Sequence, residues 1–160
     1  MNQPIRVLFV CLGNICRSPT AEGVFRERLR HHDLEEQVEV DSCGTGHWHV
    51  GKAPDERARR AAAERGVDIG HLRARQFEPE DLDSFHYVLA MDRQNLADIR
   101  DIWLQQGGTE PRLFLDFLPD RREQEVPDPY YGGDDGFAHV LDLITEASDG
   151  LLADIRARLA

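Results

Sequence analysis

The residues best suited to chemistry lie close together near the N-terminus, within the stretch VCLGNICRSP at positions 10–19. Cys11 offers a thiol nucleophile, and Arg17 offers a planar cation that can bind two oxygens of an anion at once. Gly13 permits backbone geometry that a side chain would obstruct, and Asn14 tolerates a left-handed backbone better than most residues. This pattern predicts a turn that holds an oxyanion beside a thiol.

The elements on either side of the turn support that interpretation. Residues 5–10 form a nearly continuous apolar run, which predicts a strand buried on both faces. Ser18 and Pro19 predict the start of a helix, with Ser18 as the N-cap and Pro19 as the first helical residue. Unpaired N–H groups and the helix dipole make such a terminus attractive to anions. We therefore expect the turn to bind phosphate and to favour the thiolate form of Cys11.

The rest of the sequence alternates between strand and helix patterns, with a helix after each strand. The expected strands are residues 38–43, 85–90 and 112–118, and the further helices are residues 54–66, 93–106 and 137–159, the last bent or weakened at Gly150. This order predicts one α/β domain over residues 1–160, with three α/β/α layers and a four-stranded parallel sheet. Ligands of such sheets bind at the carboxyl ends of the strands, where the turn lies.

Composition and charge exclude several classes of protein. The chain of 160 residues has a formal net charge of −11, which argues against a general nucleic-acid binder. The apolar stretch after Met1 is too short for a signal peptide or a membrane span, so neither is expected. Three cysteines, at 11, 16 and 43, cannot form a closed disulfide framework, and we expect a cytoplasmic location. Their spacing does not supply a zinc site, and no metal or other cofactor is expected.

The turn is better suited to phosphoryl transfer than to nucleotide binding. The nucleotide-binding pattern GxxxxGK[ST] is absent, and no lysine follows the loop. A thiolate that shares a cradle with an arginine can attack phosphorus in line, and water can then release phosphate from the phosphocysteine. The leaving phenolate of an aryl phosphate needs a proton donor. Asp128, in the stretch VPDPYYGG at 126–133, is the candidate acid, and Tyr130 and Tyr131 are suited to line a slot for an aromatic ring.

Three motifs together resemble the low-molecular-weight protein tyrosine phosphatases over almost the whole chain. They are CxGNxCRS from Cys11, GTxxWHVG at residues 44–51, and DPYY from Asp128. The resemblance implies that Cys11 is the nucleophile, that Arg17 binds phosphate and the transition state, and that Asp128 is the general acid and then the base. It also implies that Ser18 donates to the Cys11 thiolate and makes it a better leaving group.

The resemblance assigns supporting and substrate-binding roles as well. Asn14 would hold the loop open through hydrogen bonds to Ser42 and His71. Cys16 would trap an oxidised Cys11 as a reversible disulfide. The loop and three aromatic residues would form a cleft that is deep enough for phosphotyrosine and leaves phosphoserine short of the floor: Leu12, Gly13, Asn14, Ile15, Cys16, Trp48, Tyr130 and Tyr131.

The sequence also bears on sub-classes of this family. Members that act on phosphoarginine carry Thr where this chain has Ile15, and arsenate reductases of similar fold use extra cysteines in a later segment, whereas this chain has none after Cys43. Two alternatives stay open: a phosphotyrosine-binding module with weak turnover, and an arsenate reductase that uses an external thiol. Phosphotyrosine-containing proteins are the expected partners, with neither nucleic acid nor a membrane, and the chain is expected to be a monomer or a weak homo-oligomer.

Overall fold

The computed structural model describes residues 3–120, 123–129 and 134–160. In that part of the chain, four strands form one parallel sheet in the order β2-β1-β3-β4, so that β1 lies between β2 and β3. The strands are β1 (Ile5–Cys11), β2 (Val38–Gly44), β3 (Tyr87–Ala90) and β4 (Arg112–Leu113). The four-stranded parallel sheet predicted from the sequence is confirmed.

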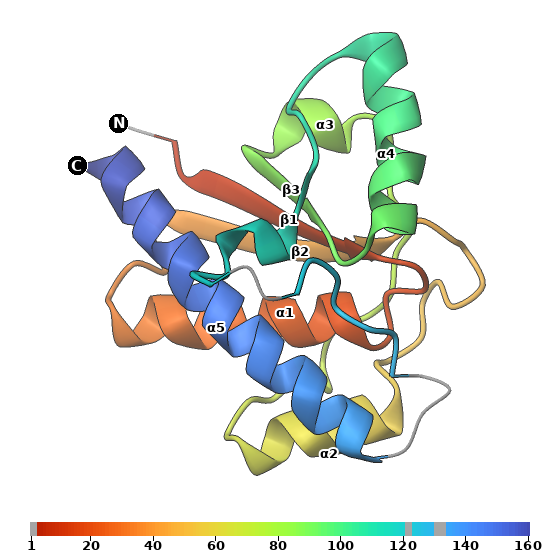
Figure 1. Cartoon of the computed structure of the whole chain (residues 1–160), viewed down its shortest axis with the longest axis vertical. Helices are drawn as coiled ribbons and strands as arrows, with labels where there is room; N and C mark the ends of the chain where they lie inside the picture. Colours follow the sequence, from red (N-terminus) through yellow and green to blue (C-terminus); the bar gives the residue numbers. More distant parts are fainter. Residues whose placement is uncertain (1–2, 121–122, 130–133) are drawn as a thin grey trace.

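Helices cover both faces of the sheet, as Figure 1 shows. One face carries α1 (Arg17–His31), α2 (Glu56–Glu64) and α5 (Asp134–Leu159). The other face carries α3 (Asp81–Ser84) and α4 (Arg93–Gln106). These layers confirm the α/β/α architecture. None of the helices in the described residues is long and apolar enough to cross a membrane.

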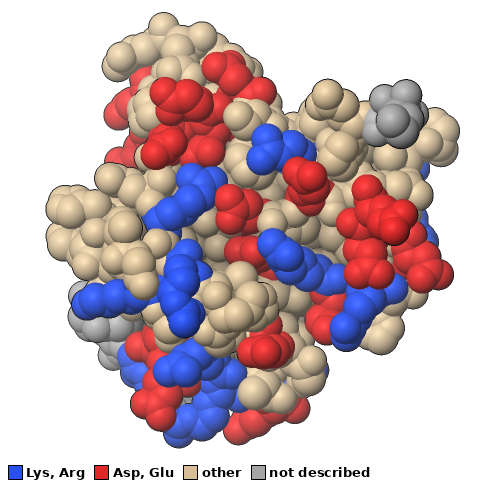
Figure 2. Space-filling view, turned by 180° about the vertical axis from the view of Figure 1, so that it is seen from behind, with Lys and Arg blue, Asp and Glu red and all other residues tan. Residues whose placement is uncertain are grey.

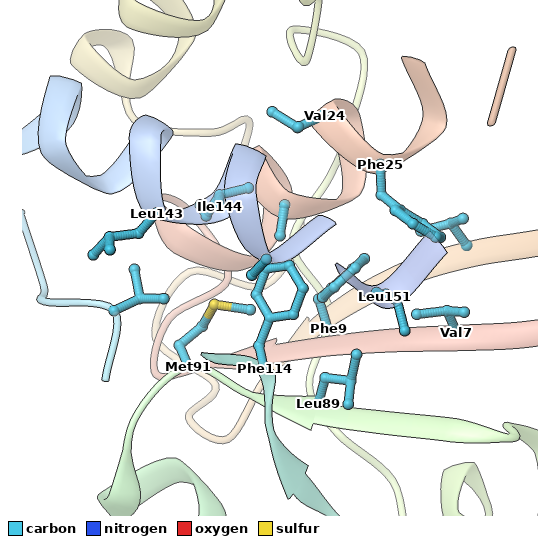
Figure 3. Close-up of a cluster of buried hydrophobic side chains, with 14 of the residues drawn as sticks. Val7, Phe9, Val24, Phe25, Leu89, Met91, Phe114, Leu143, Ile144 and Leu151 are labelled. Carbon is cyan, nitrogen blue, oxygen red and sulfur yellow. The ribbon is translucent and has the colours of Figure 1, made fainter. Parts of the chain in front are cut away.

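The larger hydrophobic core lies between the sheet and the helices α1, α2 and α5 (Figure 3). Phe9 of β1 points into it, with ring centroids 4.9 Å from Phe114 and 6.0 Å from Phe25, both in edge-on arrangements. Leu8, on the opposite face of β1, packs in a second cluster with Ile99 of α4. Both faces of β1 are therefore buried, which explains its unbroken apolar run.

The prediction of a strand over residues 112–118 is wrong for most of its length. Only Arg112–Leu113 is a strand, and the chain then forms the 3-10 helix η1 (Phe114–Phe117), which packs on α5. A strand sends neighbouring side chains to opposite faces, whereas this tight turn can bury consecutive ones. The apolar residues that suggested a strand are buried in this way: Phe114 at 0%, Leu115 at 1% and Leu118 at 2% exposure.

Four elements begin at other residues than predicted. α2 begins at Glu56, two residues later than predicted, and α5 begins at Asp134, three residues earlier. α1 begins at Arg17, with Cys16 in the N-cap position, and not after Ser18. The Ser18 hydroxyl is not a cap because it is hydrogen-bonded with the sulfur of Cys11. β3 begins at Tyr87, two residues later than predicted, after the turn that follows α3.

Charges of both signs are mixed over the surface. Figure 2 shows Lys and Arg side chains interspersed with Asp and Glu on the face opposite to the view of Figure 1. Some of them pair along one helix, as Arg30 does with Glu27 in α1 and Arg60 with Glu56 in α2. The acidic balance of the whole chain, 30 carboxylates against 19 Lys and Arg, is therefore partly neutralised locally.

α5 passes so close to η1 that Gly150 has no room for a side chain. An ideal Cβ at Gly150 would lie 1.9 Å from the carbonyl oxygen of Phe117. The helix continues through this residue from Asp134 to Leu159. The glycine therefore serves the close approach of two elements.

We predict that Gly150→Ala destabilises the protein, although alanine is normally the better helix former by about 1 kcal/mol. The clash with Phe117 should lower the free energy of unfolding by about 1–3 kcal/mol, as overpacking does. Gly136→Ala in the same helix is the matched control, because an ideal Cβ there meets Pro129 at 3.6 Å, an ordinary contact. Urea unfolding measures both variants. Unchanged or increased stability of Gly150→Ala would contradict the close contact.

Candidate active site

The predicted turn lies at the carboxyl ends of the central strands, where the sequence analysis places a ligand. Cys11 at the end of β1 pairs with Gly44 at the end of β2, and Val10 pairs with Ala90 of β3. A cavity of about 330 Å³ opens at this edge of the sheet. Three segments far apart in the sequence supply its lining: Cys11, Leu12, Gly13, Ile15, Cys16 and Arg17, then Trp48 and His49, then Asp128.

The loop between Cys11 and α1 keeps its shape through the side chain of Asn14. Asn14 has a φ of 56°, in the left-handed region that asparagine tolerates better than most residues other than glycine, and it is 3% exposed. Its Nδ2 donates to Ser18 Oγ at 2.7 Å and to Ser42 Oγ at 3.0 Å, and its Oδ1 accepts from the backbone N–H of Arg75 at 3.0 Å. In this conformation the backbone N–H of Asn14 donates to the Cys11 sulfur at 3.2 Å.

Cys11 and Cys16 line the same cavity but lie in different surroundings. The sulfur of Cys11 lies 2.9 Å from Ser18 Oγ, in addition to the N–H of Asn14. Burial raises the pKa of the Cys16 thiol, and the negative charge of Asp55 raises it further. Cys16 is therefore a neutral thiol at neutral pH, whereas Cys11 has the hydrogen-bond donors that stabilise a thiolate.

Arg17 is almost completely buried, at 3% exposure, and carboxylates balance its charge. Its guanidinium donates to Asp92 Oδ2 at 2.6 Å and to the Val126 carbonyl at 3.1 Å, and it lies 3.7 Å from Asp128 Oδ2. Burial lowers the pKa of Arg17, but the negative charge of Cys11 and the hydrogen bond to Asp92 raise it by more, so that the pKa is raised overall. The guanidinium is therefore a fixed positive charge beside the cavity.

Asp128 reaches the cavity from the segment before α5. The buried Val126 anchors this segment, because its N–H donates to the Met91 carbonyl at 2.8 Å and its own carbonyl accepts from Arg17. The Asp128 side chain is 35% exposed, so its carboxylate is open to solvent at the edge of the cavity. The aromatic pair predicted to line the same cleft lies outside the described residues: Tyr130 and Tyr131.

Another wall of the cavity comes from residues 44–51, which are attached to the loop by backbone hydrogen bonds. The N–H of Gly46 donates to the Leu12 carbonyl at 2.9 Å. Trp48 lies directly over Gly46, since an ideal Cβ at that glycine would be 1.8 Å from the indole ring. Trp48 is nevertheless 61% exposed, and it lines the cavity together with His49. Trp48 therefore lies at the cleft, as predicted, and His49 lines the cleft in addition to the predicted residues.

His71 does not reach Asn14, contrary to the sequence prediction. It is exposed and lines a separate cavity beside β2. The backbone N–H of Arg75 donates to Asn14 Oδ1 in its place. The Arg75 guanidinium is in turn bound by Asp81, at 3.0 and 3.2 Å, and by Asp41, at 3.1 Å. These ion pairs fix the backbone that supports the loop.

Comparison with known families decides the class of this site. Residues 6–160 match the family model described as low molecular weight phosphotyrosine protein phosphatase. The chain belongs to this family. The low molecular weight protein-tyrosine-phosphatase YfkJ of Bacillus subtilis is 40% identical over 152 residues, which cover 95% of this chain and 96% of the relative. The low molecular weight phosphotyrosine protein phosphatase of Schizosaccharomyces pombe is 42% identical over 156 residues, with 97% and 99% covered.

Solved structures show that low molecular weight phosphatases share this fold. The crystal structure of YfkJ from Bacillus subtilis matches with a TM-score of 0.92 and 38% identity, and 98% of each chain is covered. The structure of the Drosophila arginine phosphatase DARP matches with a TM-score of 0.88 and 27% identity, and it covers 94% of this chain and 98% of its own. The fold is therefore shared by relatives whose names give different substrates.

Among the residues that were not predicted from the sequence are Asp92, which binds Arg17, and His49, which lines the cavity. Asp92 lies two residues after the end of β3, and this position near the carboxyl end of an expected strand is a signal that could have placed it near Cys11. His49 stands next to Trp48 in the quoted motif. A loop pattern does not show which of two neighbouring side chains faces a cavity, so His49 gave no signal of its own.

We predict that Asp92→Ser lowers the free energy of unfolding by about 1.5–3 kcal/mol, because the buried Arg17 loses a charged acceptor. Serine can still cap α4, as Asp92 does by accepting from the N–H of Asn95. Asp55→Ser is the matched control, because Asp55 caps α2 but pairs with Arg57 only at 3.3 Å and with partial exposure. Asp55→Ser should lower the free energy of unfolding by less than about 1 kcal/mol.

Urea unfolding of both variants in phosphate-free buffer at neutral pH measures this difference. A loss for Asp92→Ser that is no larger than the loss for Asp55→Ser would show that Asp92 acts only as a helix cap, and would contradict its role as the partner of Arg17.

Proposed function

We propose that this protein is a protein tyrosine phosphatase that hydrolyses phosphotyrosine and small aryl phosphates through a phosphocysteine intermediate. One observation carries the proposal: the loop aims a backbone N–H and a serine hydroxyl at the Cys11 sulfur, with the charged Arg17 beside it. Membership of the family supports the same reaction. So do the names of the Bacillus and Schizosaccharomyces relatives.

In the first step, the Cys11 thiolate attacks phosphorus. The S–P bond forms, and the bond between phosphorus and the tyrosine oxygen breaks. Arg17 and the loop N–H groups bind the equatorial phosphate oxygens, where negative charge is concentrated in the transition state. Asp128, in its acid form, gives its proton to the leaving phenolate. The products of this step are a phosphocysteine and a neutral tyrosine hydroxyl.

In the second step, water attacks the phosphocysteine. Asp128, now a carboxylate, accepts a proton from the water, and the S–P bond breaks to release inorganic phosphate. The departing sulfur regains its negative charge. Ser18, whose Oγ lies 2.9 Å from that sulfur, donates a hydrogen bond to it and stabilises the leaving thiolate.

The depth of the cavity supports the choice of phosphotyrosine. Cys11 is 2% exposed at its floor, whereas Trp48 is 61% exposed at its wall. An aryl phosphate can place its ring along this wall while its phosphate reaches the sulfur, and the shorter side chain of phosphoserine holds the phosphate away from the floor. Ile15 presents an apolar side chain in the cavity lining, which is unfavourable for the guanidinium of phosphoarginine.

We place this enzyme in the cytoplasm, as one phosphatase domain over residues 1–160 that acts on phosphotyrosine-containing proteins as a monomer or weak homo-oligomer. Cys11, Cys16 and Cys43 are all unpaired, a state that a reducing compartment preserves. Because Cys16 lines the same cavity as Cys11, it is placed to form a reversible disulfide with an oxidised Cys11.

We expect the reduced protein to release phosphate from p-nitrophenyl phosphate and phosphotyrosine peptides, and not from matched phosphoserine or phosphoarginine peptides. Cys11→Ser should abolish turnover, because its hydroxyl does not ionise at neutral pH, while phosphate still binds at Arg17. Steady-state phosphate release measures both proteins. Turnover by Cys11→Ser, or tight phosphopeptide binding without turnover by the reduced wild type, would overturn the proposal.

Asp128→Ala should slow aryl phosphates according to their leaving groups. Phenyl phosphate, whose leaving group needs a proton, should lose about 10²–10⁴-fold in kcat/KM. The nitrophenyl ester should lose much less, because nitrophenolate is a stable anion. A series of substituted aryl phosphates measures this dependence. Equal slowing of all esters would exclude Asp128 as the general acid.

A further inference from the structure

A buried carboxylate lies near the catalytic loop, at a position the mechanism does not use. Glu22 of α1 is 3% exposed, although glutamate is rarely buried unless it is paired. Its Oε1 accepts from Ser42 Oγ at 2.7 Å, and its Oε2 accepts from Arg26 at 2.6 Å. Ser42 in turn holds the Asn14 amide. The carboxylate is therefore one end of a buried hydrogen-bond chain whose other end is the catalytic sulfur.

The direction of each hydrogen bond in this chain follows from the groups that can only donate. The backbone N–H of Arg75 fixes Oδ1 of Asn14 as an acceptor, so that Nδ2 faces both serines. Ser42 and Ser18 each accept one N–H from Asn14, and each must send its own proton elsewhere. The Ser42 proton goes to Glu22, and the Ser18 proton is free for the sulfur 2.9 Å away.

The sulfur is the better of two acceptors near Ser18. The other is the carbonyl of Cys43, which is 3.3 Å from Ser18 Oγ and uncharged. An ionised Cys11 is closer and can only accept, and hydrogen bonds to charged acceptors are roughly twice as strong as neutral ones. The ordered chain therefore makes Ser18 a donor to the thiolate.

We propose that Glu22 is a positioning residue of this enzyme: by accepting from Ser42, it fixes the Asn14 amide and keeps Ser18 a donor to the Cys11 thiolate. The inference rests on the proposed function and deepens it. Without this acceptor, the Ser42 hydroxyl has no group to donate to. It can then turn its proton toward the Asn14 amide, which is itself a donor, and weaken that hydrogen bond. Asn14 is then held less firmly in its left-handed conformation.

A carboxylate suits this position better than an amide does. Its two oxygens accept from Ser42 and Arg26 at the same time, whereas an amide has one oxygen for two donors. The pKa of Glu22 is raised overall, mainly by burial and further by the negative charge of Asp41. The hydrogen bond from Ser42 and the charge of Arg26 oppose this shift. The Arg26 side chain is 53% exposed, so the series of hydrogen bonds that begins at the Cys11 sulfur reaches solvent beyond Glu22.

The test is Glu22→Gln, which keeps the shape of the side chain. Arg26 can only donate, so it takes the single amide oxygen and turns the NH₂ group toward Ser42. Ser42 then receives two donors and its own proton has no acceptor along the chain. We expect kcat with a phosphotyrosine peptide to fall by about 10–100-fold, with a much smaller change in KM. The pH midpoint of Cys11 alkylation by iodoacetamide, followed by mass spectrometry, should move upward.

A second substitution distinguishes hydrogen-bond direction from loss of packing. In Glu22→Gln/Arg26→Met, the amide is free to turn its oxygen back to Ser42, so kcat should recover by about tenfold over the single variant. Glu27→Gln is the matched control, since Glu27 pairs with the exposed Arg30 on the same helix and does not belong to the chain. It should leave kcat and the alkylation midpoint unchanged.

Wild-type values of kcat and of the alkylation midpoint in Glu22→Gln would overturn the proposal, and so would an equal loss of kcat in the double variant. If thermal unfolding shows that Glu22→Gln is not folded, Ser42→Ala breaks the same link, and an unchanged alkylation midpoint there would overturn it. A wild type that releases no phosphate would reject the proposed function alone, because alkylation tests Glu22 without turnover.

Discussion

The side chain of Asn14 makes the hydrogen bonds on which the rest of the site depends. Its left-handed backbone costs about 1–2 kcal/mol, and its side chain makes three hydrogen bonds that contribute about 0.5–1.5 kcal/mol each. Together the three bonds contribute about 1.5–4.5 kcal/mol, which matches or exceeds the cost, and each partner that is lost reduces this margin. Those partners come from α1, from β2 and from the segment before α3. Three segments far apart in the sequence thus hold the N–H of Asn14 against the Cys11 sulfur.

A second constraint is the burial of a cation in a chain whose net charge is −11. Two carboxylates lie near Arg17, and their different distances from the guanidinium indicate different roles. Asp92 binds at 2.6 Å and caps α4, so it is a permanent partner. Asp128 lies at 3.7 Å from the guanidinium, and its side chain is 35% exposed at the edge of the cavity. The proposed mechanism accordingly gives the proton transfer to Asp128, the carboxylate that is more open to solvent.

The sequence predicted the parts whose residue types are decisive and missed those that depend on tertiary partners. The strand, turn and helix around Cys11 followed from an apolar run, a small turn residue and a phosphate-binding pattern. The helix cap that the local pattern predicts at Ser18 is wrong, because its hydroxyl is hydrogen-bonded with the buried Cys11 sulfur, the partner that the family resemblance implies. The support of Asn14 by Arg75 was not predictable, because the donor is a backbone N–H that every residue except proline has.

Trapping the bond between phosphorus and the Cys11 sulfur is the most direct test of the proposed chemistry. The reduced protein is mixed with a phosphotyrosine peptide, quenched in acid during turnover and digested for mass spectrometry of the fragment that contains residues 11–17. One phosphoryl group should be found on Cys11 and none on Cys16. Steady turnover with no phosphoryl group on Cys11, or with the group on another residue, would contradict the mechanism.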